Sequence, residues 1–270
     1  MGMRFHKMHG LGNDFVIVDG REQSVTMTPE LARAIADRHR GVGCDQLILI
    51  GKSDKADVSM RIWNHDGGEV ESCGNASRCV VALTGARTIE TPAGVIEGAP
   101  AGSEVEVSIR EPRFDWEDIP LSYAMDTTAL PLAWDGLKNG FAVNVGNPHI
   151  IFFVDDPEKV ELDVFGPRIE SDPAFPERIN VHVAKMSDDG IHMRSWERGA
   201  GLTLACGTGA CAAAVAAIAT KRAKSPVAVH MPGGTLTIAW KPGEPVRMRG
   251  ATTHVFSGDL DVENVGKCAP

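Results

Sequence analysis

The chain has 270 residues, of which 43% are hydrophobic and 23% charged, and its formal net charge is −9. This composition is typical of a globular protein that buries its cores without disulfides or metals, and the length favours about two domains. The negative charge argues against a nucleic-acid partner or an anionic membrane surface, because both favour a basic face.

The N-terminal segment "MGMRFHKMHGLGNDF" has neither the apolar core nor the cleavage pattern of a secretion signal. The longest apolar run, "GACAAAVAAIAT", is shorter than the ~20 residues that a membrane span requires. We therefore expect a cytoplasmic protein in which this run forms a buried helix.

Strands dominate the predicted elements. A helix is expected over residues 28–40, where Thr28 caps and Pro29 occupies the first helical position. Two further helices are expected after Cys73 and after Cys206, each with one apolar stripe at helical spacing. The proline-containing segment 110–125 is the expected crossover between two halves. Segments that are β-branched or alternating predict strands at residues 15–20, 46–51, 58–64, 104–110, 141–146, 149–155, 179–185, 191–197 and 235–240.

The chain contains an internal repeat. "MRIWNHDGGEVESCG" begins at Met60 and "MRSWERGAGLTLACG" at Met193, so Met, Arg, Trp, Cys and Gly recur with an offset of 133. Each half also has a Gly-Asn pair before a strand, at Asn13 and Asn147, with an offset of 134. The same elements surround both copies, which predicts a duplicated α/β domain.

The repeat places Cys73 and Cys206 at two helix starts, each followed by glycine. Unpaired N–H groups and the helix dipole at such a position bind anions and lower a thiol pKa from about 8.5 towards 3.5–7.5. If the halves face one another, two thiols flank one carbon. This arrangement suits inversion of an amino acid by removal and return of its α-proton, with the helix starts holding the carboxylate.

The two copies differ where they would contact a ligand. Asn64 corresponds to Glu197, and His65 corresponds to Arg198. Phe15 corresponds to His149. These differences indicate an asymmetric substrate whose distal end has its own polar contacts. Taken singly, Asn13 and Asn147 could be turn residues, His149 a strand histidine and the pair 197–198 a solvated ion pair.

The motifs "HGLGNDFVIVD", "GVGCDQ", "NHDGGEVESCGNASRC", "VGNPH", "INVHVA", "WERGAGLTLACGTGACAAA" and "THVFSGDL" together resemble those of the diaminopimelate epimerase family, in order over most of the chain. The resemblance implies an isomerase without pyridoxal phosphate, metal or other cofactor, which interconverts LL- and meso-diaminopimelate for lysine and peptidoglycan synthesis. It also implies a homodimer with no nucleic-acid or membrane partner.

For the fold, the resemblance implies an α/β (α+β) class with two pseudo-symmetric domains, each a curled, mostly antiparallel sheet around a central helix. The first would comprise residues 1–118 and 258–270, the second residues 119–257, with the C-terminal strand returning to the first. Ala76 departs from the family's more frequent "CGNG", a mild change if that residue is helical.

The resemblance also assigns site residues. Cys73 and Cys206 correspond to the acid–base pair, and His149 and Glu197 to side chains that tune the thiols. The positions that hold the substrate correspond to Asn13, Gln46, Asn64, Gly74, Asn75, Asn147, Asn180, Glu197, Arg198, Gly207 and Thr208. No residue corresponds to a metal ligand.

Other function classes predict different features. A proline racemase or hydroxyproline epimerase would share the two thiols, but its small cyclic substrate would not need distal contacts such as Asn64, Asn180 and Arg198. A phenazine-synthesis isomerase works without the thiol pair. A thiol redox or zinc protein would contain C-x-x-C spacing, which is absent. A single-thiol hydrolase would leave the second Cys-Gly unexplained. The remaining cysteines are expected to be buried and structural: Cys44, Cys79, Cys211 and Cys268.

Overall fold

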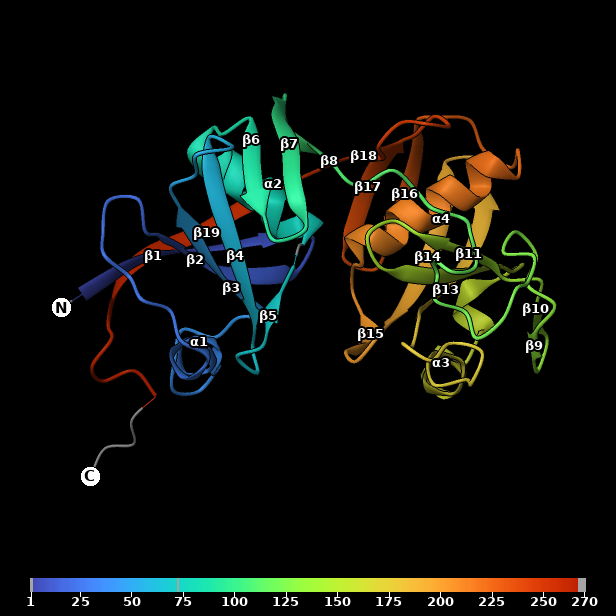
Figure 1. The fold of residues 1–270 in the computed structure, drawn as a ribbon, viewed down its shortest axis with the longest axis horizontal. Coiled ribbons are helices and arrows are strands. Elements are labelled where there is room, and N and C mark those ends of the chain that lie inside the picture. Colours follow the sequence, from blue (N-terminus) through green and yellow to red (C-terminus); the bar gives the residue numbers. More distant parts are fainter. Residues whose placement is uncertain (1, 72, 267–270) are drawn as a thin grey trace. The chain divides into compact units, whose positions relative to one another are not determined.

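The computed structural model describes residues 2–71 and 73–266, and it divides into two compact units (Figure 1). The first comprises Met1–Val107 with Gly250–Pro270, and the second comprises Ser108–Arg249. The boundaries expected from the sequence lay at 118/119 and 257/258. The expected crossover, residues 110–125, belongs to the second unit, because Ile119 and Leu121 are buried in its core.

The first unit is a twisted mixed sheet with two helices. Along the sheet, β19 pairs with β1, β1 with β2, β2 with β3, β3 with β4, β4 with β6, β6 with β7 and β7 with β8. The short strand β5 pairs with β4. The helices are α1 (Pro29–Ala36) and α2 (Gly74–Thr84). The strands are β1 (Gly2–Gly10), β2 (Asn13–Asp19), β3 (Gln46–Gly51), β4 (Val58–Asn64), β5 (Glu69–Val70), β6 (Thr88–Thr91), β7 (Gly94–Ala101), β8 (Glu104–Ser108) and β19 (Thr253–Asp261).

The second unit repeats this plan. Its helices are η1 (Pro157–Lys159), α3 (Leu162–Glu170) and α4 (Gly207–Ala219). Its main strands are β11 (Phe141–Asn144), β12 (Pro148–Phe153), β13 (Asn180–Ser187), β14 (Gly190–Glu197), β15 (Gly201–Thr203), β16 (Val227–Met231), β17 (Gly234–Ala239) and β18 (Arg247–Gly250). A separate two-stranded ribbon is formed by β9 (Ala133–Trp134) and β10 (Leu137–Lys138).

The duplication extends to strand direction. In the first unit, β1–β2 is antiparallel, β2–β3 parallel, β3–β4 antiparallel, β4–β6 parallel and β6–β7 antiparallel. In the second, β11–β12, β12–β13, β13–β14, β14–β16 and β16–β17 follow the same sequence of directions. The predicted duplicated α/β fold is confirmed. The C-terminal strand also returns to the first unit, where β19 pairs with β1 along its length (Figure 1).

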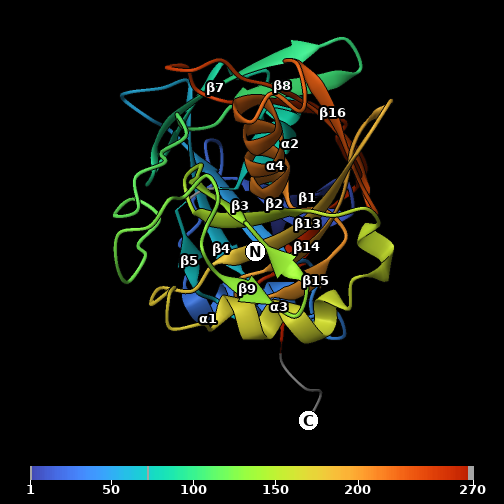
Figure 2. The ribbon, with the colours of Figure 1, turned by 90° about the vertical axis from the view of Figure 1, so that its right-hand side faces the viewer.

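The helices that begin after the repeated cysteines are buried on nearly all sides. In α2 the first eight residues, from Gly74 to Val81, are buried, including the charged Arg78. Helix α4 contacts β11–β14, β16 and β17 and runs through the middle of its unit (Figure 2). The expected single apolar stripe was therefore wrong, because a helix enclosed by a curled sheet has almost no solvent face. None of the helices in the described part of the chain is long and apolar enough to span a membrane.

The sequence missed helix α3, which occupies the place in the second unit that α1 occupies in the first. Its segment "LDVFGPRIE" contains Gly166 and Pro167, both poor helix formers. Buried Leu162 and Ile169 join it to the core, so tertiary packing stabilises the helix despite its low propensity. Helix α1 ends at Ala36, four residues before the predicted end, and Asp37 already has extended backbone angles.

Candidate active site

In the first unit, Cys73 is the N-cap of α2, so its thiol lies where the helix has unpaired N–H groups. The Cys73 Sγ is 3.9 Å from Asn13 Oδ1, which also accepts a hydrogen bond of 3.3 Å from Asn75 Nδ2. Asn13 is itself held by Asp45, whose Oδ2 accepts from Asn13 Nδ2 at 3.1 Å. Asn13, Cys73 and Asn75 therefore form one polar cluster at this helix start. Gly74 is the first helical residue.

Two more predicted residues lie opposite one another on adjacent strands of the first unit. Gln46 of β3 pairs in register with Asn64 of β4, and Gln46 Nε2 donates to Asn64 Oδ1 at 2.9 Å. Gln46 Oε1 and Asn75 Oδ1 are buried without a hydrogen-bond partner among the described residues. Buried acceptors of this kind are costly to leave unpaired, so they favour a ligand that donates, such as an ammonium group.

In the second unit, Cys206 is the N-cap of α4 and is only 2% exposed. Its Sγ accepts a hydrogen bond of 3.3 Å from the Gly209 N–H and lies 3.7 Å from Thr208 Oγ1. Gly207 begins the helix. The structure thus places both repeated cysteines at equivalent helix starts.

The expected low thiol pKa is wrong for Cys206. Burial raises its pKa well above the ordinary value of 9.0, and the Glu197 carboxylate beside it raises the pKa further. The hydrogen bond from the Gly209 N–H acts in the opposite direction but is the weaker influence. Cys206 therefore rests as a protonated thiol, which is the form that gives a proton.

A chain of hydrogen-bonded side chains runs from the partly buried Asn147 to the buried Ser195. His149 Nε2 is 2.8 Å from Asn147 Oδ1, and His149 Nδ1 is 2.8 Å from His182 Nε2. His182 Nδ1 is 2.9 Å from Ser195 Oγ. Since the Asn147 Oδ1 can only accept, His149 carries its proton on Nε2, and His182 Nε2–H and the Ser195 hydroxyl donate along the chain. Burial lowers the pKa of His149 well below 6.5 and that of His182 to about 3, so both rings are neutral.

His182 and Gly209 are site components that the sequence interpretation missed. A Cβ on Gly209 would lie 2.4 Å from His182 Cε1, so the imidazole fills the space that a side chain of the helix would need. The signal was present in the repeat. His182 corresponds to Ile48 with an offset of 134, and Gly209 corresponds to Ala76 with an offset of 133. In the second unit, a longer strand side chain with a planar ring therefore accompanies a smaller helix residue. Ala76 is helical and buried in α2, so the departure from "CGNG" is accommodated.

The turn after β14 presents Glu197 and Arg198. Buried Asn180 holds this turn, because its Oδ1 accepts from the Arg198 N–H at 3.0 Å while its Nδ2 donates to the Pro148 carbonyl at 2.8 Å. Thr203 Oγ1 donates to Glu197 Oε1 at 2.6 Å. The Arg198 guanidinium, on an exposed residue, donates to the Glu177 carbonyl at 2.9 Å.

A further anchor of this turn, Glu170 of α3, was also missed. Its carboxylate accepts from Trp196 Nε1 at 2.7 Å and from the Gly199 N–H at 3.0 Å. No sequence pattern marks it, because α3 itself was not predicted. Glu170 therefore fixes the turn that carries Arg198.

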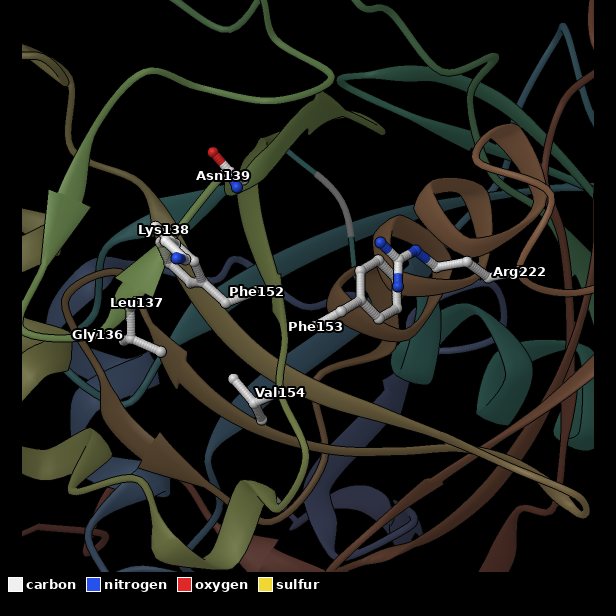
Figure 3. A pocket seen from close by; sticks show the side chains of 8 residues that line it. All are labelled: Gly136, Leu137, Lys138, Asn139, Phe152, Phe153, Val154 and Arg222. Carbon is white, nitrogen blue, oxygen red and sulfur yellow. The ribbon is translucent and has the colours of Figure 1, made fainter.

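The other thiols in the described range are structural in character. Cys44, Cys79 and Cys211 are buried, and burial raises the pKa of Cys44 and of Cys79 to about 12. Cys268 lies outside the described residues. A separate shallow hollow in the second unit contains none of the predicted site residues and has Arg222 stacked 4.7 Å from the Phe153 ring (Figure 3).

Comparisons with known proteins agree with the geometry. The family model described as diaminopimelate epimerase matches residues 5–115 and 141–255. A diaminopimelate epimerase of Sphingopyxis alaskensis is 58% identical over 268 residues, covering 98% of this chain and 100% of the relative. Two solved structures share the fold at low identity. A phenazine biosynthesis protein of the PhzF family from Bacillus anthracis has a TM-score of 0.68 at 16% identity, and covers 96% of this chain and 99% of its own. A hydroxyproline epimerase from Agrobacterium vitis has a TM-score of 0.67 at 14% identity, covering 99% of this chain and 96% of its own.

The likeness to those two structures extends only to the fold. The relative at 58% identity and the family model, by contrast, match the sequence along most of its length and include both Cys-Gly helix starts. This chain belongs to the diaminopimelate epimerase family.

Proposed function

We propose that the chain is an isomerase that interconverts LL- and meso-diaminopimelate in the synthesis of lysine and peptidoglycan precursors. The observation that carries the proposal is the repeated cysteine N-cap of a central helix, one in each unit of a chain that belongs to this family. The reaction uses neither pyridoxal phosphate nor a metal, since two thiols and two helix N-termini supply acid, base and anion stabilisation.

Each thiol has a distinct role in this proposal. Cys73 removes the α-proton as a thiolate, and Cys206, the protonated thiol, returns a proton to the opposite face of the same carbon. Glu197 helps to keep Cys206 protonated, because its charge raises the pKa of that thiol. In the reverse direction the roles exchange, as microscopic reversibility requires.

The substrate's reacting end is held at the helix starts. The N–H groups following Cys73 and Cys206, at Gly74–Asn75 and Gly207–Thr208, bind the α-carboxylate as the carbanion develops. Asn13, whose Oδ1 already accepts from Asn75, orients this end. Gln46 Oε1 is a buried acceptor for an ammonium group.

For the distal end we propose contacts from polar residues at the positions that match the family's substrate-holding residues. Arg198 binds the distal carboxylate through paired N–H donors. Asn64 and Asn147 provide amides, and Asn180 keeps the turn that carries Arg198 in place. His149 positions Asn147, because its Nε2–H donates to the Asn147 Oδ1 at 2.8 Å.

The assembly and location follow from the resemblance. We propose a cytoplasmic homodimer that binds neither nucleic acid nor membrane. The net charge of −9 supports the exclusion of nucleic acid. Sedimentation equilibrium at several protein concentrations tests the dimer, and a monomer at all of them would contradict it.

The decisive experiment measures whether the proton returned to the inverted carbon comes from the solvent. The reaction is run from one pure stereoisomer in heavy water, without added cofactor, and sampled early. Two thiols on opposite faces predict deuterium at the inverted carbon of the product, while unreacted substrate keeps its hydrogen. Product that retains the original hydrogen would exclude the two-thiol mechanism.

Alanine variants supply the matched controls. Cys73→Ala and Cys206→Ala should each abolish epimerisation, because each leaves one face of the carbon without its group. Cys211→Ala should keep activity, since this thiol is buried within α4 and away from the helix start. A substrate panel that includes proline and hydroxyproline separates the alternative activity, and turnover of those substrates in place of diaminopimelate would favour it.

A further inference from the structure

Two histidines stand side by side on the sheet of the second unit. His192 of β14 and His230 of β16 are direct partners in a parallel pairing, so both side chains lie on the same face. Their rings stack with centroids 4.6 Å apart and an interplanar angle of 28°. Lys185 pairs with His192 on one side, and Thr235 pairs with His230 on the other. The fold thus places two imidazoles next to each other in one row.

The turn between β13 and β14 adds a carboxylate to this pair. Gly190 follows the turn with a φ of 137°, and a Cβ at this position would lie 2.4 Å from the Ala228 carbonyl of β16. Only glycine therefore lets the turn approach β16 so closely. Asp189 consequently reaches both rings. Its Oδ1 is 2.9 Å from His192 Nε2, and its Oδ2 is 3.7 Å from His230 Nε2.

The hydrogen bonds of His230 define its tautomer. Its Nε2–H donates to the backbone carbonyl of Asp189, 3.1 Å away, because a carbonyl oxygen can only accept. The Thr235 hydroxyl therefore donates to His230 Nδ1 at 2.9 Å. For Nε2 to coordinate a metal, the ring proton moves to Nδ1, where Thr235 Oγ1 can accept it, as in metal sites where a hydrogen bond to one ring nitrogen fixes the coordinating nitrogen.

We propose that Asp189, His192 and His230 bind one divalent transition-metal ion of the Zn²⁺, Ni²⁺ or Cu²⁺ class. One donor atom from each residue lies within 4.8 Å of the others, so small side-chain rotations bring all three onto one ion. Two imidazoles and one carboxylate favour these ions over Mg²⁺ and Ca²⁺, which prefer all-oxygen sites. The side chains of Asp189, His192 and His230 are 63%, 44% and 27% exposed, which leaves room for water to complete the coordination.

Charged side chains around the site affect how strongly it attracts a cation. Asp188 and Asp189 of the turn attract a cation, whereas Lys185 stands opposite His192 on β13 and repels one. When bound, the ion would connect the β13–β14 hairpin to β16 and would stabilise the second unit by mass action.

The test measures binding of Ni²⁺ alone by isothermal titration calorimetry at pH 7.5 with a non-thiol reductant. Wild type should bind one equivalent at this site, and His192→Gln and His230→Gln should each weaken that binding by about tenfold or more. The matched control is His6→Gln, because His6 and His254 form another pair of neighbouring histidines, in an edge-on arrangement with ring centroids 5.6 Å apart. That variant should bind as wild type does.

Two further readouts distinguish the site from general histidine binding. Lys185→Gln should tighten Ni²⁺ binding, and Ni²⁺ should raise the melting temperature of wild type but not of His192→Gln. Neither measurement uses epimerase activity, so the result is independent of the proposed function. Unchanged Ni²⁺ affinity in both His192→Gln and His230→Gln would overturn the proposal.

Discussion

Replacing Gly209 by alanine tests how α4 packs on the buried histidine chain. The new Cβ would lie 2.4 Å from His182 Cε1, 2.9 Å from Nε2 and 3.0 Å from Nδ1. Ordinary contact begins near 3.4 Å, so the ring would need to move by about 1 Å. The ring is held at both ends, by His149 at 2.8 Å and by Ser195 at 2.9 Å, and therefore has little freedom to move.

These contacts allow the change in the free energy of unfolding to be estimated. Overpacking a buried site of this kind costs about 1–3 kcal/mol, and we expect Gly209→Ala to lower the free energy of unfolding by that amount. Alanine is intrinsically better than glycine inside a helix by about 0.5–1 kcal/mol. In a His182→Ala background the clash is gone, so the same Gly209→Ala change should stabilise the protein. The substitution thus reverses its sign between the two backgrounds.

A double-mutant cycle measures this reversal. Urea unfolding of wild type, both single variants and the double variant gives the coupling free energy, provided that the denaturant dependence (the m-value) is unchanged. His182→Ala breaks the same two hydrogen bonds in both backgrounds, so that loss cancels from the cycle. Equal destabilisation by Gly209→Ala with and without the imidazole would refute the packing argument.

Two other outcomes follow from the same unit. The free energy of unfolding should fall as the pH drops below about 6.5, because burial lowers the pKa values of His149 and His182 and only the unfolded chain then takes up their protons. Each histidine contributes a slope of about 1.4 kcal/mol per pH unit to this fall. Urea titrations at several pH values should therefore show that the free energy of unfolding declines less steeply with falling pH in His182→Gln than in wild type. Identical slopes in the two proteins would contradict this prediction. Arg198→Ala should raise KM by about tenfold or more, because the variant loses a charged, paired hydrogen bond to the substrate. Lys224→Ala, at an exposed position, should leave KM unchanged. Initial-rate kinetics that find equal KM values in the two variants would remove Arg198 from the binding site.

The sequence predicts the parts of the fold that have a strong local signal. Strands 46–51 and 58–64 occur at the residues expected, because β-branched and alternating side chains coincide there with buried positions. Strands such as β7 were missed, since Gly94–Ala101 contains two glycines and a proline and is recruited by pairing with its neighbours. Helix α3 was missed for a similar reason, because its stability comes from tertiary contacts.

The candidate site likewise combines residues that a local sequence pattern predicts with residues that only the folded chain brings together. The positions of Cys73 and Cys206 at helix starts followed from the repeat, because a cysteine followed by glycine at the head of an apolar helix is a local pattern. The pKa of Cys206 could not be predicted, since it depends on burial and on Glu197, which is close only in the folded chain. His182 likewise acquires its role from two partners distant in sequence, His149 and Ser195.

The return of β19 to β1 has a consequence for biosynthesis. The second unit is a continuous stretch, 108–249, so all of it has been synthesised before the first unit is complete. The first unit needs Thr253–Asp261 to cover one edge of β1, and these residues leave the ribosome near the end of translation. Domains generally fold in the order in which they emerge, but here the unit that begins first is the one that must wait. Until then its β1 edge is an exposed template for strand pairing with other chains.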